Sequence, residues 1–154
     1  MKEREHKIAA AAAMSGHWPK EGNGRPATIL LVDDDQELLR CLAEVLARFG
    51  YQVIALPKAE TALSEIGAGT PVDAVITDYK LNGMDGIQFL YALRHLRPEL
   101  PAIMLTGHGT LEGYVKAKGL GAVEFLEKPV RARDLARTID SHLSGTDVRR
   151  HTLD

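Results

Sequence analysis

Charged and polar residues follow four of the short apolar segments in this chain. They are two adjacent carboxylates, a third carboxylate, a hydroxyl and an amine, supplied by Asp33, Asp34, Asp78, Thr106 and Lys128. Carboxylate oxygens suit a hard cation such as Mg²⁺, whereas a hydroxyl and an ammonium group suit a phosphoryl group. If the fold brings these side chains together, the chemistry they favour is cation-assisted phosphorylation of a carboxylate.

Five apolar segments alternate with segments of helical period, and these elements must position the side chains. The expected strands are 28–32, 52–55, 74–77, 102–105 and 122–126. Short strands that are apolar along their whole length are typical of a parallel sheet covered on both faces. We therefore predict an α/β fold with a doubly wound, five-stranded parallel sheet, in which ligands bind at the carboxyl ends of the strands.

Apolar residues recur at helical spacing between the strands. The first such stripe runs from Leu38 to Phe49 and is followed by Gly50, which predicts a helix closed by a C-terminal glycine. Further helices are predicted at 59–66, 87–96 and 135–143. Asp35 is expected to be the N-cap of the first helix. Cys41 lies beside the apolar stripe of that helix, and we expect it to be a small packing residue.

The three carboxylates would repel one another at the shared edge of adjacent strands, and a cation would relieve this repulsion. No Cys–His set suited to zinc is available, because the chain has one cysteine, so oxygen ligands and Mg²⁺ are favoured. Lys128 would add a second positive charge, and Thr106 would donate a hydrogen bond to a phosphoryl oxygen. Taken singly, Thr106 is an ordinary strand-end hydroxyl and Lys128 an ordinary surface charge. Together, the three carboxylates, the hydroxyl and the amine indicate phosphorylation of a carboxylate.

Four strings, ILLVDDD, DAVITDYKLNGMDG, AIMLTGHG and GAVEFLEKP, occur in this order between Thr28 and Leu143. Together they resemble the receiver domain of bacterial two-component response regulators. The last two strings most resemble receivers of nitrogen-regulation and nitrogen-fixation type regulators. The resemblance covers the whole part of the chain that we predict to fold. It implies a (βα)5 flavodoxin-like fold with strand order 2-1-3-4-5, in a protein switched by phosphorylation.

The resemblance assigns the acidic residues to two roles. It implies that Asp78 is the phospho-acceptor. It also implies that Asp33, Asp34 and Asp78 hold Mg²⁺, together with the backbone carbonyl of Lys80.

The remaining site residues would act on the phosphoryl group or respond to it. The resemblance implies that Thr106 and Lys128 contact this group. Phe125 falls at the aromatic switch position, whose ring turns inward as Thr106 moves toward the phosphate, although the pattern alone also fits a core residue. Lys80 and His108 lie near the mouth of the predicted site. We expect them to limit the access of water to the acyl phosphate and so to slow its hydrolysis.

Two features depart from the family pattern. Asn82 stands where a proline is usual, and Asn82-Gly83 is still a good turn pair. The fourth helix carries Gly113 and Gly119, each costing about 1 kcal/mol relative to alanine, and Lys118 occupies a position that is commonly apolar. We expect this helix to be short or frayed, which would ease rearrangement of the output face, unless tertiary packing overrides its weak propensity.

The composition indicates a single globular domain. The 154 residues are 45% hydrophobic and 26% charged, with a formal net charge of −2, which shows no bias toward nucleic acid or membrane surfaces. No signal peptide or membrane-spanning run is evident, and the single cysteine fits a cytoplasmic location. We predict a flexible N-terminal tail at 1–26, a receiver domain at 27–144 and a C-terminal tail at 145–154. In the N-terminal tail, Trp18 could dock onto the domain or a partner, and Met14 could be an alternative start.

The predicted function is a phosphoryl-accepting signalling switch and not a metabolic enzyme. A sensor histidine kinase or a histidine phosphotransfer protein would supply the phosphoryl group, and an unidentified protein would receive the signal. A homodimer could form through the fourth helix, the last strand and the fifth helix. No membrane contact and no direct binding of nucleic acid are expected.

Three alternatives compete with a stand-alone receiver, which the Met1 start and the polar C-terminal end favour. The chain could be the receiver part of a DNA-binding transcriptional regulator, since the residues after Leu143 are too few for a DNA-binding module. It could be a Mg²⁺-dependent aspartyl-phosphate hydrolase, for which Asp33 and Asp35 provide Asp-x-Asp, but no acidic pair follows Lys128. It could also be a degenerate receiver that acts as a scaffold, although all five active-site positions are present.

Overall fold

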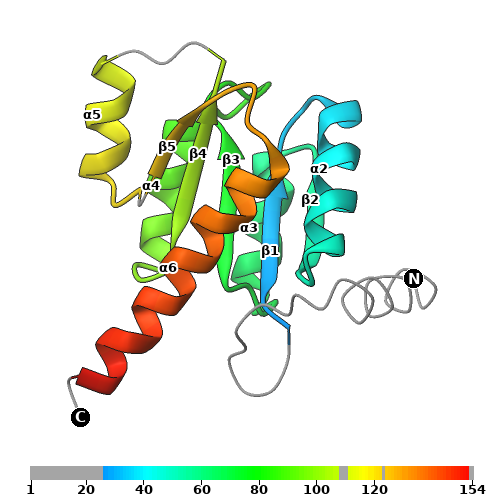
Figure 1. Ribbon diagram of the computed structural model, residues 1–154. Coiled ribbons are helices and arrows are strands. Elements are labelled where there is room, and N and C mark those ends of the chain that lie inside the picture. Colours follow the sequence, from blue (N-terminus) through cyan, green and yellow to red (C-terminus); the bar gives the residue numbers. More distant parts are fainter. Residues whose placement is uncertain (1–25, 108–110, 123, 153–154) are drawn as a thin grey trace.

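A five-stranded parallel sheet forms the centre of the molecule (Figure 1). The structure is a computed structural model that describes residues 26–107, 111–122 and 124–152. The strands follow the order β2-β1-β3-β4-β5, and every neighbouring pair is parallel. The predicted fold class and strand order are therefore confirmed. Residues 1–25 of the predicted N-terminal tail, with Met14 and Trp18, and the loop residue His108 lie outside the described residues.

The strands lie close to the predicted segments. They are β1 (Thr28–Val32), β2 (Gln52–Leu56), β3 (Ala74–Asp78), β4 (Ala102–Thr106) and β5 (Glu124–Glu127). The second, third and fourth strands each extend one residue further than predicted, so that two of the predicted site residues, Asp78 and Thr106, are themselves the last strand residues. The last strand begins at Glu124 and leaves Ala122, where we predicted its start, outside it.

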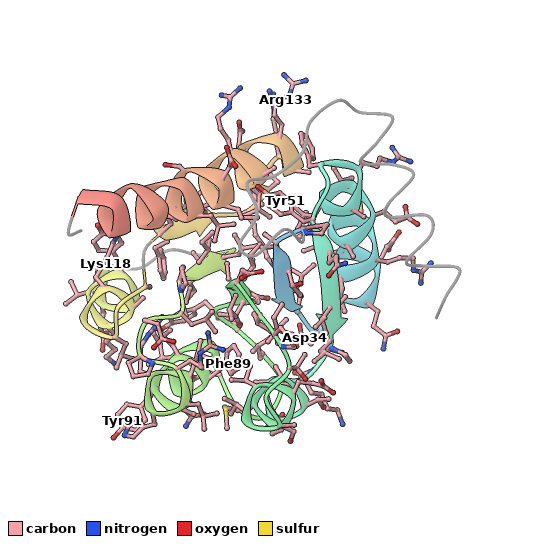
Figure 2. The ribbon with its side chains drawn as sticks, turned by 90° about the horizontal axis from the view of Figure 1, so that it is seen from below. Asp34, Tyr51, Phe89, Tyr91, Lys118 and Arg133 are labelled. Carbon is pink, nitrogen blue, oxygen red and sulfur yellow. The ribbon has the colours of Figure 1, made fainter. Side chains whose placement is uncertain are left out.

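The helices cover both faces of the sheet. They are α2 (Gln36–Arg48), α3 (Ala59–Gly67), α4 (Gly86–Leu96), α5 (Leu111–Gly119) and α6 (Ala132–Thr152). Figure 2 shows α2 and α6 on one side of the sheet and α3 and α4 on the other. Ala117 of α5 packs in the same apolar cluster as Phe89 and Leu90 of α4, so α5 belongs to the second layer.

Alternation along the strands divides the core into two apolar layers. Leu30, Val75 and Met104 pack against α3, α4 and α5. Their strand neighbours, including Ile29 and Ile76, pack against α2 and α6. The three central strands β1, β3 and β4 are buried along their whole length and are mostly apolar, as expected where helices cover both faces of the sheet, whereas the edge strands β2 and β5 are only partly buried.

Helix α2 follows the predicted pattern at both ends. The side chain of Asp35 accepts a hydrogen bond from the backbone N–H of Leu38 at 3.2 Å, which confirms it as the N-cap. Gly50 follows the helix with a φ of +97°, as expected of a glycine that closes a helix. The prediction for Cys41 is wrong, because this residue is exposed on α2 and does not pack in the core. The buried stripe of α2 consists of Leu39, Leu42 and Leu46, and Cys41, next to Leu42 in the sequence, lies outside this stripe and faces solvent.

Helix α5 runs from Leu111 to Gly119, so the expected fraying is not seen among the described residues and the alternative, that packing overrides the weak propensity, holds. It remains helical through Gly113, which is buried, and Ala117 is fully buried in the core. The backbone N–H of Leu120 donates to the carbonyls of Lys116 and Ala117 at 3.1 and 3.2 Å, which closes the helix. Packing and this closure offset the weak propensity of the glycines.

Helix α6 is longer than the apolar pattern predicted. Its buried residues include Leu135 and Ile139, but the helix continues to Thr152, into the segment that we predicted to be a tail from residue 145. No proline interrupts residues 144–152, so helical hydrogen bonding can continue past the last apolar position. Within the part of the chain that the structure describes, no helix has both the length and the apolar character needed to cross a bilayer.

Candidate functional site

The predicted site residues meet at the carboxyl edge of the sheet. Asp33 directly follows β1, while Asp78 and Thr106 end the neighbouring strands β3 and β4. Their exposed fractions are only 1% for Asp33, 8% for Asp78 and 2% for Thr106. Buried polar groups require partners, so this edge must supply hydrogen bonds or charges that stabilise them.

Asp33, Asp34 and Asp78 form one acidic cluster. Each offers a carboxylate oxygen, and these oxygens all lie within 4.8 Å of one another. Figure 2 labels Asp34, the half-buried member of the cluster, which lies in the loop between the end of β1 and the start of α2. Three carboxylates at this separation repel one another unless positive charge is close by.

Lys128 supplies the positive charge that the structure places in this cluster. Its Nζ donates to Asp33 Oδ2 at 2.9 Å and to Asp78 Oδ2 at 3.1 Å. The backbone N–H of Lys128 donates to the carbonyl of Thr106 at 2.7 Å, and the following bond to Pro129 is a cis peptide. The hydrogen bond to Thr106 holds the loop after β5 against the end of β4, where the ammonium group of Lys128 reaches both carboxylates.

Burial and charge act in opposite directions on the two members of this pair. Burial raises the pKa of the Asp78 carboxyl, the hydrogen bond and charge of Lys128 offset this in part, and the charge of Asp33 raises the pKa further. Burial alone would lower the pKa of Lys128, but its hydrogen bonds to Asp33 and Asp78 outweigh burial and raise that pKa above its usual value. Lys128 therefore remains charged at neutral pH. Burial disfavours the ionised form of Asp78, and the hydrogen bond and charge of Lys128 stabilise that form in part.

Backbone N–H groups orient all three carboxylates. The N–H of Asp35 donates to Asp33 Oδ1 at 2.9 Å, and the N–H of Asn82 donates to Asp34 Oδ2 at 3.1 Å. The N–H of Lys80 lies 3.4 Å from Asp78 Oδ1. The backbone geometry after β1 and β3 thus fixes how the carboxylates face one another. The side chain of Lys80 is exposed, and the predicted role of its carbonyl toward a metal stays a prediction.

Gly86 is a structural residue of the site that the sequence analysis did not single out. It begins α4, and its N–H donates to the carbonyl of Tyr79 at 2.8 Å. A Cβ at this position would lie 2.4 Å from the carbonyl oxygen of Asp78 and 2.9 Å from the Cα of Tyr79. Only glycine allows α4 to begin this close to the backbone of Asp78. The available signal was the pair Asp85-Gly86 before a helical pattern, where Asp85 forms a capping box with Gln88.

The ring of Phe125 contacts two tyrosine rings. On β5 it pairs in register with Met104 of β4. Its ring meets Tyr79 edge to face with centroids 6.2 Å apart and meets Tyr114 of α5 in the same way at 5.9 Å. The two tyrosines were not predicted from the sequence, because contacts between rings on separate elements leave no periodic pattern. The switch role of Phe125 stays a prediction.

The strand order and the polar edge define a class of protein: doubly wound, flavodoxin-like α/β domains with an acidic site at the strand ends. Residues 29–140 match the model of the response regulator receiver domain, so the chain belongs to this family. The match favours the receiver over the hydrolase that the Asp-x-Asp string also allowed.

Individual relatives agree with this assignment. The response regulator FleR of Pseudomonas aeruginosa is 36% identical over 119 residues, which cover 77% of this chain and 25% of FleR. The nitrogen assimilation regulatory protein NtrX of Azorhizobium caulinodans is 35% identical over 124 residues, which cover 79% of this chain and 27% of NtrX. A crystal structure of a CheY-like receiver domain protein from Methanospirillum hungatei superposes with a TM-score of 0.76 at 32% identity, covering 80% of this chain and 98% of that one.

These comparisons confirm the resemblance to receivers of nitrogen-regulation type, of which NtrX is an example. The chain spans about a quarter of the length of FleR and NtrX. The similarity therefore concerns their receiver domains. Receiver domains accept phosphoryl groups from histidine kinases, and the acidic cluster of this chain is one that could bind a metal ion.

Proposed function

We propose that this chain is a phosphorylation-controlled switch in which Asp78 accepts a phosphoryl group from a phosphohistidine. The observation that carries the proposal is the position of Lys128 Nζ, which lies within 3.1 Å of both Asp78 and Asp33 at the carboxyl edge of the sheet. A buried carboxylate beside a fixed ammonium group has the charge arrangement that an incoming phosphoryl group requires.

The acidic cluster fits Mg²⁺. Among the described residues its donors are carboxylate oxygens alone, within 4.8 Å of one another, with no histidine or cysteine in the group. When ionised, three carboxylates opposed by one ammonium group leave two uncompensated negative charges, which a divalent cation would balance. Oxygen donors of this kind suit a hard cation. When bound by Asp33, Asp34 and Asp78, Mg²⁺ would neutralise charge on the group being transferred.

The residues of the chain would divide the work of transfer. One carboxylate oxygen of Asp78 forms a bond to phosphorus while the bond from phosphorus to the donor histidine nitrogen breaks, and its electron pair leaves with the imidazole. Lys128 is in place to donate to a phosphoryl oxygen, because it already donates to Asp78. Thr106 ends the adjacent strand, where its hydroxyl could donate to a second phosphoryl oxygen.

The added charge would then bias the output face. Phosphorylation adds negative charge and strong acceptors at the end of β3. Thr106 and Phe125, on the neighbouring strands β4 and β5, are the groups that we expect to respond. The product is a change of conformation and not a released metabolite, so we propose a signalling module and not an enzyme in the metabolic sense.

The proposed partners follow from this role. A sensor histidine kinase or a histidine phosphotransfer protein would act as donor, in the cytoplasm. An unidentified protein would read the switched face formed by α5, β5 and α6, through which a homodimer could also form. Several relatives are named transcriptional regulators, so output through a DNA-binding domain linked to a receiver of this kind is the second candidate.

The test is incubation with Mg²⁺ and acetyl phosphate, followed by measurement of the intact mass. We expect a gain of one phosphoryl group that disappears in the Asp78→Asn variant and in samples without Mg²⁺. A phosphorylated histidine phosphotransfer protein should be supplied in parallel, to distinguish a strict donor preference from a lack of acceptor chemistry. Absence of the mass gain with both donors, in protein that binds Mg²⁺, would refute the switch and favour a scaffold.

A further inference from the structure

The loop between β3 and α4 is held at two points by carboxylates from other elements. At residue 82, the backbone N–H of Asn82 donates to Asp34 Oδ2 at 3.1 Å. At residue 84, the backbone N–H of Met84 donates to Glu60 Oε1 of α3 at 3.3 Å. The two contacts join the loop that follows Asp78 to the segment after β1 and to the beginning of α3.

The first contact reaches directly into the acidic cluster. Asp34 is one of the three residues whose carboxylate oxygens lie within 4.8 Å of one another. Unlike Asp33 and Asp78, it has no hydrogen bond to Lys128 among the described contacts. A carboxylate on a half-exposed side chain turns freely unless a donor fixes one of its oxygens. The N–H of Asn82 is such a donor, and because a carboxylate has about four lone-pair sites, the others remain available to a cation.

We propose that the backbone N–H of Asn82 is a positioning group that orients Asp34 for a divalent cation. This inference rests on the cation site of the proposed function. Partners that hydrogen-bond to metal-ligating side chains commonly contribute a factor of about 10–100 to metal affinity. The coupling between the hydrogen bond and cation binding is reciprocal. A cation bound by Asp34 therefore stabilises the hydrogen bond from Asn82, and with it the loop.

The identity of residue 82 makes the contact a property of this chain. Proline, the usual residue here in the family that the chain resembles, has no N–H and could not donate to Asp34. Gly83 follows with a φ of +83°, a conformation that turns accept after either proline or asparagine. The same turn can therefore form with asparagine or with proline at residue 82. Only asparagine supplies the backbone N–H that donates to Asp34.

Glu60 of α3 supports the contact by holding the same loop at Met84. Its Oε1 accepts from the N–H of Met84 and lies 3.2 Å from the position that a Cβ on Gly83 would take, so the carboxylate packs close to the turn. Glu60 is not part of the acidic cluster of Asp33, Asp34 and Asp78. Its effect on the cation would act through the position of the loop.

The experiment compares Asn82→Pro with Asn82→Ala in Mg²⁺ titrations of the unphosphorylated protein, followed by backbone amide shifts in NMR spectra. Asn82→Ala keeps the N–H and should bind Mg²⁺ like the wild type. Asn82→Pro removes the N–H and should bind about 10-fold more weakly. Glu60→Ala should weaken binding in the same direction, and Glu60→Gln, which keeps an acceptor oxygen, should restore it.

The outcomes separate this inference from the proposed function. Equal Mg²⁺ affinity in the wild type, Asn82→Ala and Asn82→Pro would overturn the role of Asn82 and leave the function untouched. A wild type that binds no Mg²⁺ would overturn both. If Asn82→Pro does not fold, the wild type alone decides, because Mg²⁺ must slow hydrogen exchange of the Asn82 amide. An exchange rate unchanged by Mg²⁺ would contradict the proposal.

Discussion

The ring of Tyr79 meets the ring of Phe125 edge to face, with centroids 6.2 Å apart and planes inclined at 73°. Tyr79 directly follows Asp78, whereas Phe125 lies on the last strand of the sheet. Tyr114 of α5 also meets the ring of Phe125 edge to face. A chain of three aromatic rings therefore connects the backbone beside the proposed phospho-acceptor to a helix of the proposed output face.

Replacing Phe125 with alanine should uncouple the phosphorylation site at Asp78 from helix α5. We expect Asp78 of Phe125→Ala to be phosphorylated at a rate within about twofold of wild type, since the ring contacts no reacting atom, with a stability loss of about 1–3 kcal/mol for the partly buried ring. The amide shifts that phosphorylation causes in α5 should be largely lost. Phe125→Tyr keeps the ring and should keep those shifts. Wild-type shifts in Phe125→Ala would show that the signal takes another route.

Lys128→Gln should separate phosphoryl transfer from cation binding. The substitution removes the ammonium group that donates to Asp33 and Asp78. We expect phosphorylation by acetyl phosphate to slow by about 100-fold, because a donor to the transferred group is lost. Mg²⁺ affinity should be unchanged or higher, because a competing positive charge leaves the carboxylates. Stopped-flow kinetics and an NMR titration measure the two quantities, and a parallel fall in both would indicate a purely structural lysine.

Gly86→Ala should destabilise the protein at the start of α4. Its Cβ would lie 2.4 Å from the carbonyl oxygen of Asp78, so the backbone of β3 or α4 must move. Strain of this kind costs about 1–3 kcal/mol and should also slow phosphorylation of Asp78. Gly67→Ala is the matched control, because a Cβ on Gly67 meets nothing within 4 Å. Urea unfolding should show that Gly67→Ala has a stability similar to the wild type or greater. Equal effects of the two substitutions would argue against the close approach.

The sequence predicted those features that depend on one element at a time. Buried strands appear as apolar runs, and their carboxyl ends place Asp33, Asp78 and Thr106 at one edge by topology alone. The sequence did not predict features that depend on how two elements pack against each other. The narrow approach of Gly86 to β3 and the ring contacts of Phe125 depend on the distance between elements, which no spacing along the chain encodes.

Boundaries without an apolar signal were also missed. Helix α6 continues to Thr152 because backbone hydrogen bonding needs no apolar side chain, whereas the prediction followed the stripe that ends at Leu143. Cys41 was assigned to the core from its place beside the stripe of α2, but a position one residue away from the buried Leu42 can face solvent. Both errors come from inferring structure from hydrophobicity alone.

The raised pKa of Asp78 predicts how stability depends on pH in metal-free protein. In the folded state burial raises this pKa above the ordinary value of 3.8, so between the two values the folded protein binds more protons than the unfolded chain. The contribution of Asp78 to stability is therefore full below about pH 3.8 and is lost as the pH rises through the folded pKa. At pH 7 the buried, ionised carboxylate is destabilising. Asp78→Asn removes this charge and keeps an oxygen that can accept from Lys128.

We therefore expect metal-free Asp78→Asn to have a higher Tm than the wild type at pH 7, and the difference should shrink as the pH approaches 4. Mg²⁺ should raise the Tm of the wild type more than that of the variant, because the cation compensates a charge that the variant lacks. Thermal melting followed by circular dichroism, across pH 4–7 and with EDTA or Mg²⁺, measures these shifts. Asn82→Ala, which leaves all three carboxylates in place, should follow the wild type throughout. A lower Tm for Asp78→Asn at pH 7 would mean that the ion pair with Lys128 stabilises the fold more than burial of Asp78 destabilises it.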